Sequence, residues 1–299
     1  MSSIKKVAVA GGTGNLGPAV LQQLLEAGFE VTVLTRKQSS HSFPSSAKVA
    51  EVDYESLESL TNALQGHDAV VSTLGGPAIA GQLKLVEAAA KAGVKRFIPS
   101  EFGSNTMHPQ TAQLPSFKGK IAVQNALKKE GQTSDLTYTL VLTGPFFDWG
   151  LKVGLVADVK GKSIKLWDGG DRVFSTTSLA TIGRAVAGVL KHPEETKNRA
   201  VYVQDTALSL KQLLEIAKRA TGSNDWKVEN AAIDDVVNKG WEELKKPEPN
   251  PANFVLNFIT LAIWGEGYGA KFDKLDNELL GIKEMSEEDI EKLIKEVAK

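Results

Sequence analysis

The 299-residue chain contains no cysteine, which excludes disulfide bonds, thiolate-bound metal ions and cysteine nucleophiles. Histidine is scarce as well, with four residues in the whole chain. No two of these histidines have the short spacing that would place two metal ligands on one helix face. We therefore expect no metal centre.

The chain also lacks an excess of one charge and a long apolar run. Its 35 basic residues nearly balance its 36 acidic ones, so no strong field attracts it to nucleic acid or to an anionic membrane. The most apolar late segment, residues 254–264, is too short to span a bilayer, and the N-terminus has no signal-peptide core. We expect a soluble, cytoplasmic protein without nucleic-acid or membrane partners, either a monomer or a homodimer.

Strand-like and helix-like segments alternate regularly in the first half of the chain. Short apolar and β-branched runs predict strands at residues 4–10, 30–35, 48–52, 69–73, 96–99 and 137–142. Helical periodicity between them predicts helices at residues 16–27, 56–64, 78–92 and 117–130. This alternation indicates an α/β protein with a doubly wound parallel sheet, the Rossmann fold.

The second half of the chain alternates less regularly. A Trp-Asp-Gly-Gly-Asp turn predicts a β-hairpin over residues 164–174, and a strand at residues 199–203 is expected to return to an edge of the sheet. Further helices are predicted at residues 178–190, 208–220, 233–244 and 286–297. We expect a nucleotide-binding domain over residues 1–150 and a smaller substrate-binding domain over residues 151–299, with the segment near 173–205 returning to the sheet.

The strongest motif is a glycine-rich segment directly after the first predicted strand. Glycine permits a tight turn and lets a phosphate approach the main chain, and the start of the following helix favours anions. A glycine pattern alone is weak evidence, but its place between a strand and a helix predicts dinucleotide binding. The predicted contacts are Gly11, Thr13, Gly14, Asn15, Leu16 and Gly17.

The end of the second predicted strand distinguishes between two dinucleotides. An NAD site usually carries an acidic residue there, which binds the ribose hydroxyls. This chain has Arg36 and Lys37 instead, and their cationic groups suit the 2′-phosphate of NADP(H). The alternative is a solvated basic turn, and we favour NADP(H) as the cofactor.

The chain has no Tyr-x-x-x-Lys pair, so the usual acid of short-chain dehydrogenases is missing, but one lysine occupies an unexpected position. In the fourth predicted helix, Lys120 falls between Phe117 and the apolar stripe that contains Val123. Lys118, by contrast, falls on the polar side. Burial and the nearby positive end of the helix dipole would both lower the pKa of Lys120 towards a range useful for acid–base catalysis. The pattern fits equally a lysine whose stem packs on apolar neighbours.

Four segments together carry a family resemblance: residues 11–17 (GGTGNLG), 72–76 (STLGG), 96–103 (RFIPSEFG) and 117–120 (FKGK). On these segments the chain resembles the isoflavone reductase-like, or phenylcoumaran benzylic ether reductase-like, branch of the atypical short-chain dehydrogenases. That branch also contains the NmrA-like proteins. The likeness extends to about residue 204 and is weaker beyond it, where the segment at residues 264–268 is more similar to fungal members.

The resemblance implies an NADP(H)-dependent oxidoreductase and assigns roles to further residues. The lysine of the family's Phe-x-x-Lys motif corresponds to Lys120, which would be the catalytic acid or base. The further cofactor contacts that the resemblance implies are Thr73, Leu74, Gly75, Ser100, Glu101, Phe102, Lys120, Phe146 and Phe147.

The substrate pocket is the least defined part of the sequence. We expect Phe147 and Trp149 to shape it, and His108 is a candidate contact whose alternative is an ordinary surface histidine. His108 belongs to a segment, residues 104–108, that replaces the charged residues usual in the plant enzymes, so the substrate stays open. The apolar helix face within residues 254–264 predicts core packing, with a pocket lid or a dimer surface as alternatives.

Two functions from different classes fit these features. The first is an NADPH-dependent reductase that transfers hydride to a small aromatic substrate, phenylpropanoid-like or quinone-like, with Lys120 as general acid or base. The second is a redox sensor similar to NmrA, which binds NADP(H) without catalysis and regulates a partner protein. The Phe-x-x-Lys match favours the enzyme, because a sensor needs no proton donor at that place.

Overall fold

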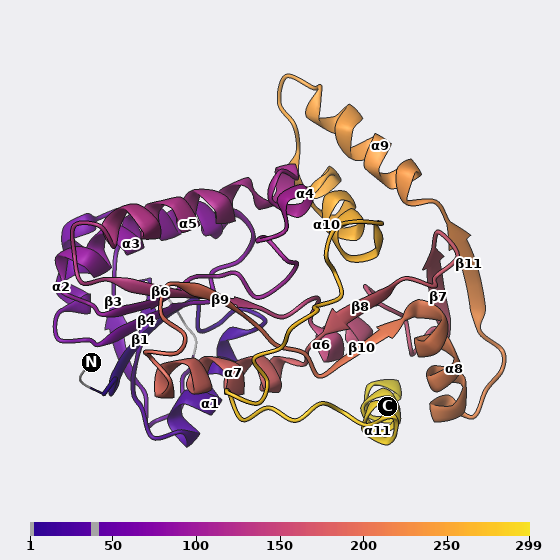
Figure 1. Ribbon diagram of the computed structural model, residues 1–299, viewed down its shortest axis with the longest axis horizontal. Helices are drawn as coiled ribbons and strands as arrows, with labels where there is room; N and C mark the ends of the chain where they lie inside the picture. The colour runs from indigo at the N-terminus through magenta and orange to yellow at the C-terminus, as the bar shows by residue number, and fades with distance from the viewer. Residues whose placement is uncertain (1–2, 37–41) are drawn as a thin grey trace.

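The central feature of the computed structural model, which describes residues 3–36 and 42–299, is a seven-stranded sheet (Figure 1). Its strand order is β3-β2-β1-β4-β5-β6-β9, and every pair of neighbours is parallel. The doubly wound parallel sheet predicted from the sequence is therefore confirmed. The strands are β1 (Lys6–Ala10), β2 (Glu30–Thr35), β3 (Lys48–Glu51), β4 (Ala69–Ser72), β5 (Arg96–Ile98), β6 (Thr137–Leu142) and β9 (Arg199–Tyr202).

Helices cover both faces of this sheet (Figure 1). One face carries α2 (Leu57–Leu64), α3 (Gln82–Lys91) and α5 (Lys118–Glu130), and the other carries α1 (Gly17–Glu26) and α7 (Leu179–Lys191). β1 and β4 are thus buried on both sides, which explains why their sequences are continuous apolar runs rather than alternating patterns. The short helical turns are η1 (Gly76–Gly81), α4 (Pro109–Ala112), η2 (Pro115–Phe117) and η3 (Pro251–Asn253).

The order of the strands reverses between β1 and β4. The chain runs outward from β1 through β2 to β3, and then crosses to β4 on the other side of β1. Sheets of this kind bind ligands at such a reversal, beyond the carboxyl ends of the strands. The glycine-rich segment follows β1 and lies at this edge of the sheet.

A smaller region with a core of its own stands beyond the ends of β6 and β9 (Figure 1). It contains two small sheets: β7 (Ser163–Trp167) pairs in parallel with β11 (Lys227–Ala231), and β8 (Val173–Thr176) pairs antiparallel with β10 (Thr206–Ser209). The helices of this region are α6 (Phe147–Lys152), α8 (Leu210–Thr221), α9 (Ile233–Leu244), α10 (Val255–Trp264) and α11 (Glu287–Ala298).

The β-hairpin predicted over residues 164–174 is wrong. β7 and β8 flank the turn, but each pairs with a strand far along the chain. Asp168, Gly169 and Gly170 all have positive φ, and Asp168 Oδ1 accepts a hydrogen bond from the backbone nitrogen of Ile233 at 3.0 Å. The hydrogen bond fixes the turn next to the start of α9. β7 and β8 on either side of the turn do not pair with each other. The sequence pattern does not predict β11 either, because its residues are mostly polar and exposed.

The chain returns to the main sheet after β8. α7 packs so closely on α1 that a Cβ atom on Gly183 would lie 2.6 Å from the backbone oxygen of Ala19. β9 then pairs with β6 at the edge of the sheet, where the sequence predicts a returning strand. Later still, Leu280 and Ile282 join the core between α1, α7 and the sheet. The part of the molecule around the main sheet is therefore assembled from segments far apart in the chain.

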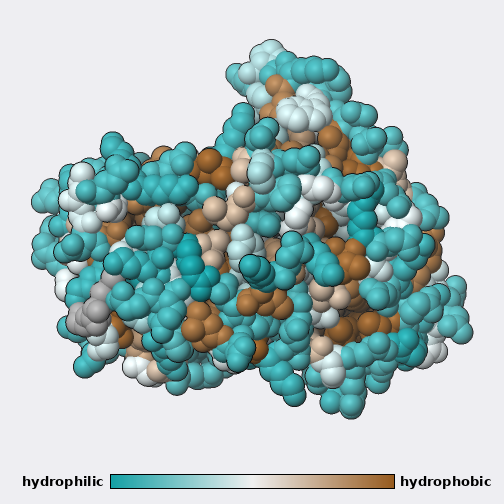
Figure 2. All heavy atoms as spheres, viewed as in Figure 1, coloured by the Kyte–Doolittle hydropathy of each residue, from teal (hydrophilic) through white to brown (hydrophobic). Residues whose placement is uncertain are grey.

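The apolar face of α10 packs inside the protein, as predicted. Phe258 and Trp264 are buried, and Phe258 shares a cluster with Leu114 and Phe117. On the face that Figure 2 shows, hydrophilic residues predominate and apolar ones gather in small groups. Within residues 3–36 and 42–299, no helix is both long enough and apolar enough to cross a membrane.

Candidate functional site

Two loops, one after β1 and one after β4, pack tightly against each other at the carboxyl ends of the strands. Gly11 has a φ of +84°, and a Cβ atom there would lie 2.8 Å from the backbone nitrogen of Leu74. Thr73 Oγ1 donates hydrogen bonds to the carbonyl oxygens of Ala10 and Gly11, at 3.0 and 2.9 Å. A Cβ atom on Gly17 would lie 2.4 Å from the Gly11 oxygen. A larger residue at either glycine would force the loops and α1 apart.

The start of α1 is open to an anion. Within the described part of the chain no side chain caps its N-terminal amides, and Thr13, Gly14 and Asn15 are exposed around them. On the loop after β4, a Cβ atom on Gly75 would meet no atom within 4 Å. Uncapped amides and the positive end of a helix favour a phosphate, so these residues fit the pyrophosphate of a dinucleotide. Leu16, a further predicted contact, is buried below the loop.

Arg36, which is predicted to bind the 2′-phosphate, follows the end of β2. Arg36 is exposed there, close to Tyr54, whose hydroxyl donates to the carbonyl oxygen of Leu34 at 3.1 Å. Burial raises the pKa of Tyr54 to about 12, and the positive charge of Arg36 opposes this rise. Lys37, the second predicted cation, lies outside the described residues.

The segment after β5 holds a buried carboxylate. Glu101 is 2 % exposed, and it accepts hydrogen bonds from Thr106 Oγ1 at 2.7 Å and from Gln124 Nε2 at 2.9 Å. Gln124 Nε2 also donates to Thr106 Oγ1 at 3.0 Å. These bonds satisfy both carboxylate oxygens, so Glu101 is held as part of a closed polar network.

The neighbours of Glu101 are fixed by their backbone. The Ser100 nitrogen donates to Oε1 of the buried Gln82 at 2.8 Å, which ties the segment to α3. Phe102 has a φ of +29°, an uncommon value for a bulky residue. Such backbone is retained where the surrounding structure holds it in place, and it is concentrated at functional sites.

Lys120, the third residue of α5, reaches this segment from the helix. Its Nζ donates to the backbone oxygen of Glu101 and lies 5.9 Å from the centroid of the Phe117 ring. Burial lowers the pKa of Lys120, and the negative charge of Glu101 opposes that effect. Lys118 is exposed on the same helix. The fold therefore brings Lys120, and not Lys118, to the ends of the strands with a pKa moved towards the neutral range.

The residues after β6 connect this site to the smaller region. Gly144 has a φ of +64°, and a Cβ atom there would lie 1.9 Å from the backbone oxygen of Ser175, so only glycine fits. Phe146 meets Trp149 edge to face, with ring centroids 6.3 Å apart. Phe147, by contrast, is fully buried in the core of the smaller region. Phe146 and Trp149 thus lie together, whereas Phe147 belongs to the core and not to an open pocket wall.

His108, the third predicted pocket residue, precedes α4 and is half-buried. It packs against the loop after α10, where a Cβ atom on Gly269 would lie 2.8 Å from the histidine ring. Its Nδ1 is buried without a hydrogen-bond partner among the described residues, and the same holds for Oδ1 of Asn105. His108 therefore lies between two loops rather than on an open surface.

A cavity of about 570 Å³ adjoins Trp149. Residues of α6, β7, β11 and α10 line it, among them Trp167 and Trp264. The sequence indicates only Trp149 of these three, because the other walls meet through the pairing of β7 with β11. The three tryptophans are far apart in the sequence. Only the pairing of β7 with β11 shows that they line one cavity.

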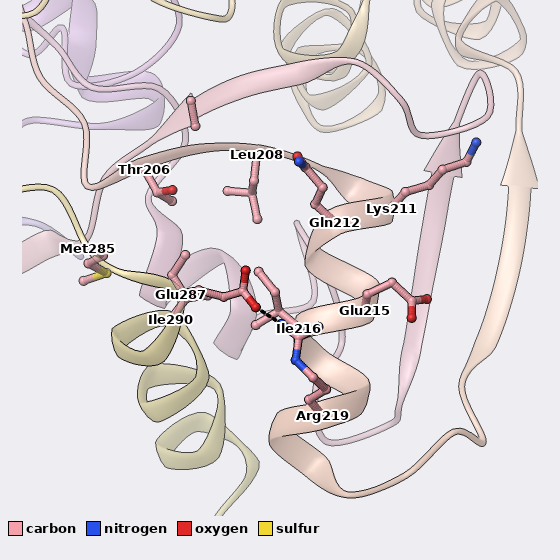
Figure 3. Close-up of a pocket in the computed structure, with 11 residues that line it drawn as sticks. Thr206, Leu208, Lys211, Gln212, Glu215, Ile216, Arg219, Met285, Glu287 and Ile290 are labelled. Atoms are coloured by element: carbon pink, nitrogen blue, oxygen red, sulfur yellow. Dashed lines mark hydrogen bonds and ion pairs between the residues drawn. The ribbon is translucent and has the colours of Figure 1, made fainter.

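A separate groove of about 420 Å³ lies between β10, α8 and α11 (Figure 3). Its charged residues already have partners. The pairs are Arg219 with Glu287 and with Glu291, Lys211 with Asp171, and Glu215 with Lys218. Among the described residues, the groove therefore offers no unpaired charge to a ligand. In the described part of the chain, no group of three or more acidic and histidine residues could hold a metal ion.

The chain matches known proteins over most of its length. The family model described as NmrA-like matches residues 3–239. Oxidoreductase poxI of Penicillium oxalicum is 32% identical over 299 residues, covering 95% of this chain and 92% of poxI. Oxidoreductase aprR of Aspergillus flavus is 34% identical over 278 residues, covering 91% of each protein. An isoflavone reductase homolog of Solanum tuberosum is 28% identical over 245 residues, covering 75% of this chain and 77% of that protein.

Solved structures share the whole architecture. The structure of AtPrR2 with NADP+ and (+)pinoresinol has a TM-score of 0.81 at 24% identity, covering 99% of this chain and 100% of that one. A ternary complex of leucoanthocyanidin reductase from Vitis vinifera has a TM-score of 0.79 at 20% identity, covering 98% and 100%. The likeness includes both the parallel sheet and the smaller C-terminal region.

The chain belongs to the NmrA-like family. The resemblance to isoflavone reductase-like proteins, which rests on four short segments of the sequence, is confirmed by the plant relatives. Two fungal relatives that match over nearly the full length, poxI and aprR, are named oxidoreductases. The protein is therefore an enzyme of the oxidoreductase class.

Proposed function

We propose that this protein is an NADPH-dependent reductase that reduces a small aromatic substrate, with Lys120 as general acid or base. The observation that carries the proposal is the position of Lys120. Its enclosed amine rests against the backbone of Glu101, at the same edge of the sheet as the glycine loop. The fold alone specifies no chemistry, but an amine of lowered pKa beside a dinucleotide site is suited to proton transfer.

The cofactor site is NADP(H)-specific in this proposal. Backbone amides near Gly14 and the start of α1 bind the pyrophosphate, Thr73 and Gly75 flank the nucleotide, and Arg36 binds the 2′-phosphate. Structures of related fold hold NADP+ in AtPrR2 and NADPH in leucoanthocyanidin reductase, which supports the assignment. When bound, NADPH supplies the hydride.

Lys120 supplies the proton that accompanies reduction. Addition of hydride to a carbonyl-like carbon leaves negative charge on the neighbouring oxygen, which an ammonium can neutralise by proton transfer. Because burial lowers the pKa of Lys120, its ammonium is a stronger acid than that of an exposed lysine. The backbone oxygen of Glu101 orients the amine, and the hydrogen bonds from Thr106 and Gln124 hold Glu101 in place.

The aromatic character of the substrate is supported by the side chains beyond β6. Phe146 and Trp149 present rings at the exit from the sheet. The names of relatives point the same way, among them isoflavone reductase homologs and eugenol synthase 1 of Petunia hybrida. AtPrR2 holds (+)pinoresinol, which is also aromatic.

The test is untargeted mass spectrometry of a metabolite extract incubated with NADPH and one of three proteins. We expect a reduced product with the wild type and with Lys118→Ala, an exposed position on the same helix. Lys120→Ala should lose about 10²- to 10⁴-fold in turnover, the usual contribution of a general acid. A parallel titration of NADPH separates loss of proton transfer from loss of cofactor binding. Full turnover by Lys120→Ala would refute the role of the lysine.

The competing function, a sensor that binds NADP(H) without catalysis, gives a different result in the same experiment. It predicts no product with any variant, even in an extract that contains aromatic ketones, ethers and quinones. It also predicts comparable affinities for NAD and NADP, which the cofactor titrations measure directly.

A further inference from the structure

Strand β11 has one edge without a partner strand. In the described part of the chain it pairs only with β7, and it lies at the outer end of the smaller region (Figure 1). Its residues 227–230 are all exposed, and Val228 is 40 % exposed although it is apolar. The free backbone groups along such an edge form a template on which another strand can pair.

The hydrogen bonds to β7 show which backbone groups of β11 point outward. The Lys227 nitrogen donates to the Lys162 oxygen at 2.8 Å, so the backbone of Lys227 faces β7. In a strand, the backbone groups of successive residues alternate between its two edges. The N–H and C=O groups of Val228 and Asn230 therefore face the open edge, where an antiparallel strand centred on Val228 would exchange two hydrogen bonds with it.

A second copy of this chain fits the open edge in one register. Antiparallel pairing about a two-fold axis places Val228 opposite the partner's Val228, and Lys227 opposite the partner's Glu229. Because the axis repeats each contact, opposite charges meet twice. A shift by one residue would instead place Glu229 opposite the partner's Glu229, where like charges repel. The charges therefore select the register centred on Val228.

Both faces of the resulting four-stranded sheet agree with this register. On one face Glu229 pairs with Lys165 of β7 at 3.2 Å, whereas Lys227 has no ion-pair partner among the described residues. A lysine at a strand edge usually deters pairing, but here the partner's Glu229 would neutralise it. On the other face Val228 lies beside Ile164, which is buried, so pairing would extend this apolar row across the axis.

We propose that two copies of this chain associate through β11, in antiparallel register with Val228 at the two-fold axis. This association goes beyond the proposed reductase function, because the edge contains neither the glycine loop nor Lys120. β11 is only five residues long, so the paired strands bury little surface. We therefore expect a weak dimer that forms at micromolar or higher concentrations of the protein.

Sedimentation velocity of the full chain, from about 1 to 200 μM, tests the edge. The wild type should sediment faster as its concentration rises. Val228→Pro removes an N–H from the open edge but no bond to β7, so the fold should survive while the dimer is lost. Val228→Thr keeps the N–H and the branched shape and should associate like the wild type. A wild type that stays monomeric throughout, or a dimer that Val228→Pro leaves intact, would overturn the proposal.

Charge reversal tests the register. Lys227→Glu and Glu229→Lys should each raise the Kd of the dimer at least about tenfold, because two contacts between like charges replace two between opposite charges. An equimolar mixture of the two variants should associate again, since every contact across the axis then joins opposite charges. Mixing cannot repair a misfolded variant, so the recovery reports on the interface alone. A mixture that associates no better than either variant would overturn the register.

Amide hydrogen exchange, followed by NMR, gives a second readout that needs no variant. The Val228 amide faces the open edge, so it should exchange rapidly in dilute protein and slowly in concentrated protein. The Lys227 amide is bonded to β7 and should be protected at both concentrations, which makes it the internal control. A Val228 amide whose exchange rate does not depend on protein concentration would overturn pairing through β11.

Discussion

The glycine loop and the cavity of the smaller region are built from different kinds of atoms, one from main chain and the other from side chains. At the glycine loop the close contacts belong to the main chain, and Gly11 and Gly17 leave no room for a Cβ atom. At the cavity the walls are side chains, including those of Trp149, Trp167 and Trp264. A backbone surface tolerates few substitutions, whereas a surface of side chains can change one residue at a time.

The largest effect is expected at the backbone end, from Gly17→Ala. The new Cβ atom would lie 2.4 Å from the Gly11 oxygen and 2.5 Å from the Gly12 carbonyl carbon, so α1 and the loop must separate. We expect the affinity for NADPH to fall roughly a hundredfold, as measured by fluorescence titration. Gly81→Ala is the control, because a Cβ atom there meets nothing within 4 Å. Unchanged affinity in Gly17→Ala would show that side chains, not backbone, hold the nucleotide.

The next largest effect is expected at Arg36, whose side chain is proposed to select NADPH over NADH. Arg36→Ala removes the exposed cation after β2. In the proposed site it would also remove one charge-assisted hydrogen-bond pair to the 2′-phosphate. The Kd for NADPH should rise about tenfold to a hundredfold while the Kd for NADH stays the same. Arg36→Lys, which keeps the charge but not the planar fork, should fall between the two. An equal loss for both cofactors would place Arg36 away from the 2′-phosphate.

Between the two ends, Glu101→Gln tests the charge beside Lys120. The carboxylate of Glu101 opposes the effect of burial, which lowers the pKa of Lys120. Without that negative charge the pKa falls further, so the ammonium form is lost at a lower pH. The alkaline limb of the kcat–pH profile should therefore move to lower pH. Thr106→Val, which removes a hydrogen bond but keeps the charge, should leave the limb in place.

The smallest effect is expected at the far end, in the turn after β7. Asp168 accepts a hydrogen bond from Arg172 at 2.7 Å, and this bond is the main cause that lowers the pKa of Asp168 below 3.8. The ionised form therefore stabilises the fold above pH 3.8, and this stabilisation is lost as the pH falls through the lower, folded-state pKa.

Asp168→Asn keeps a residue that tolerates positive φ and removes the charge. Because the pair is one-third exposed, the free energy of unfolding at neutral pH should fall by only about 0.5–1 kcal/mol. Denaturant titrations at neutral and acidic pH measure this difference, which should vanish in acid. Asp171→Asn, at an exposed neighbouring ion pair, should have a still smaller effect. A difference that persists in acid would mean that the carboxylate charge plays no part.

Much of the cofactor end could be predicted from the sequence because its signals are local. β6 occupies residues 137–142, as the β-branched run predicts. The place of Lys120 also follows from helical periodicity, since Lys120 turns inward and Lys118 outward. The network around Glu101 could not be predicted, because it joins β5 to α5 through Gln124, a residue with no motif of its own.

The cavity end was less predictable because its contacts are distant in sequence. Ser163 of β7 pairs with Lys227 of β11, so the glycine turn after β7 wrongly suggests a hairpin. The three tryptophans of the cavity lie on α6, β7 and α10, and no spacing in the sequence relates them. Among the described residues, the indole N–H of Trp264 has no hydrogen-bond partner. This depends on how several distant elements pack around it, which the sequence does not show.

The return of β9 to the sheet bears on how the protein can be cut into fragments. A fragment that ends near residue 150 would leave β6 with an open edge, whose unpaired backbone groups invite pairing with another chain. The same fragment would lack α7, which packs closely on α1 at Gly183. One side of α1 would then be exposed. The chain passes several times between the main sheet and the smaller region, so more than one segment connects them. A movement of one region relative to the other must therefore bend several connecting segments at once.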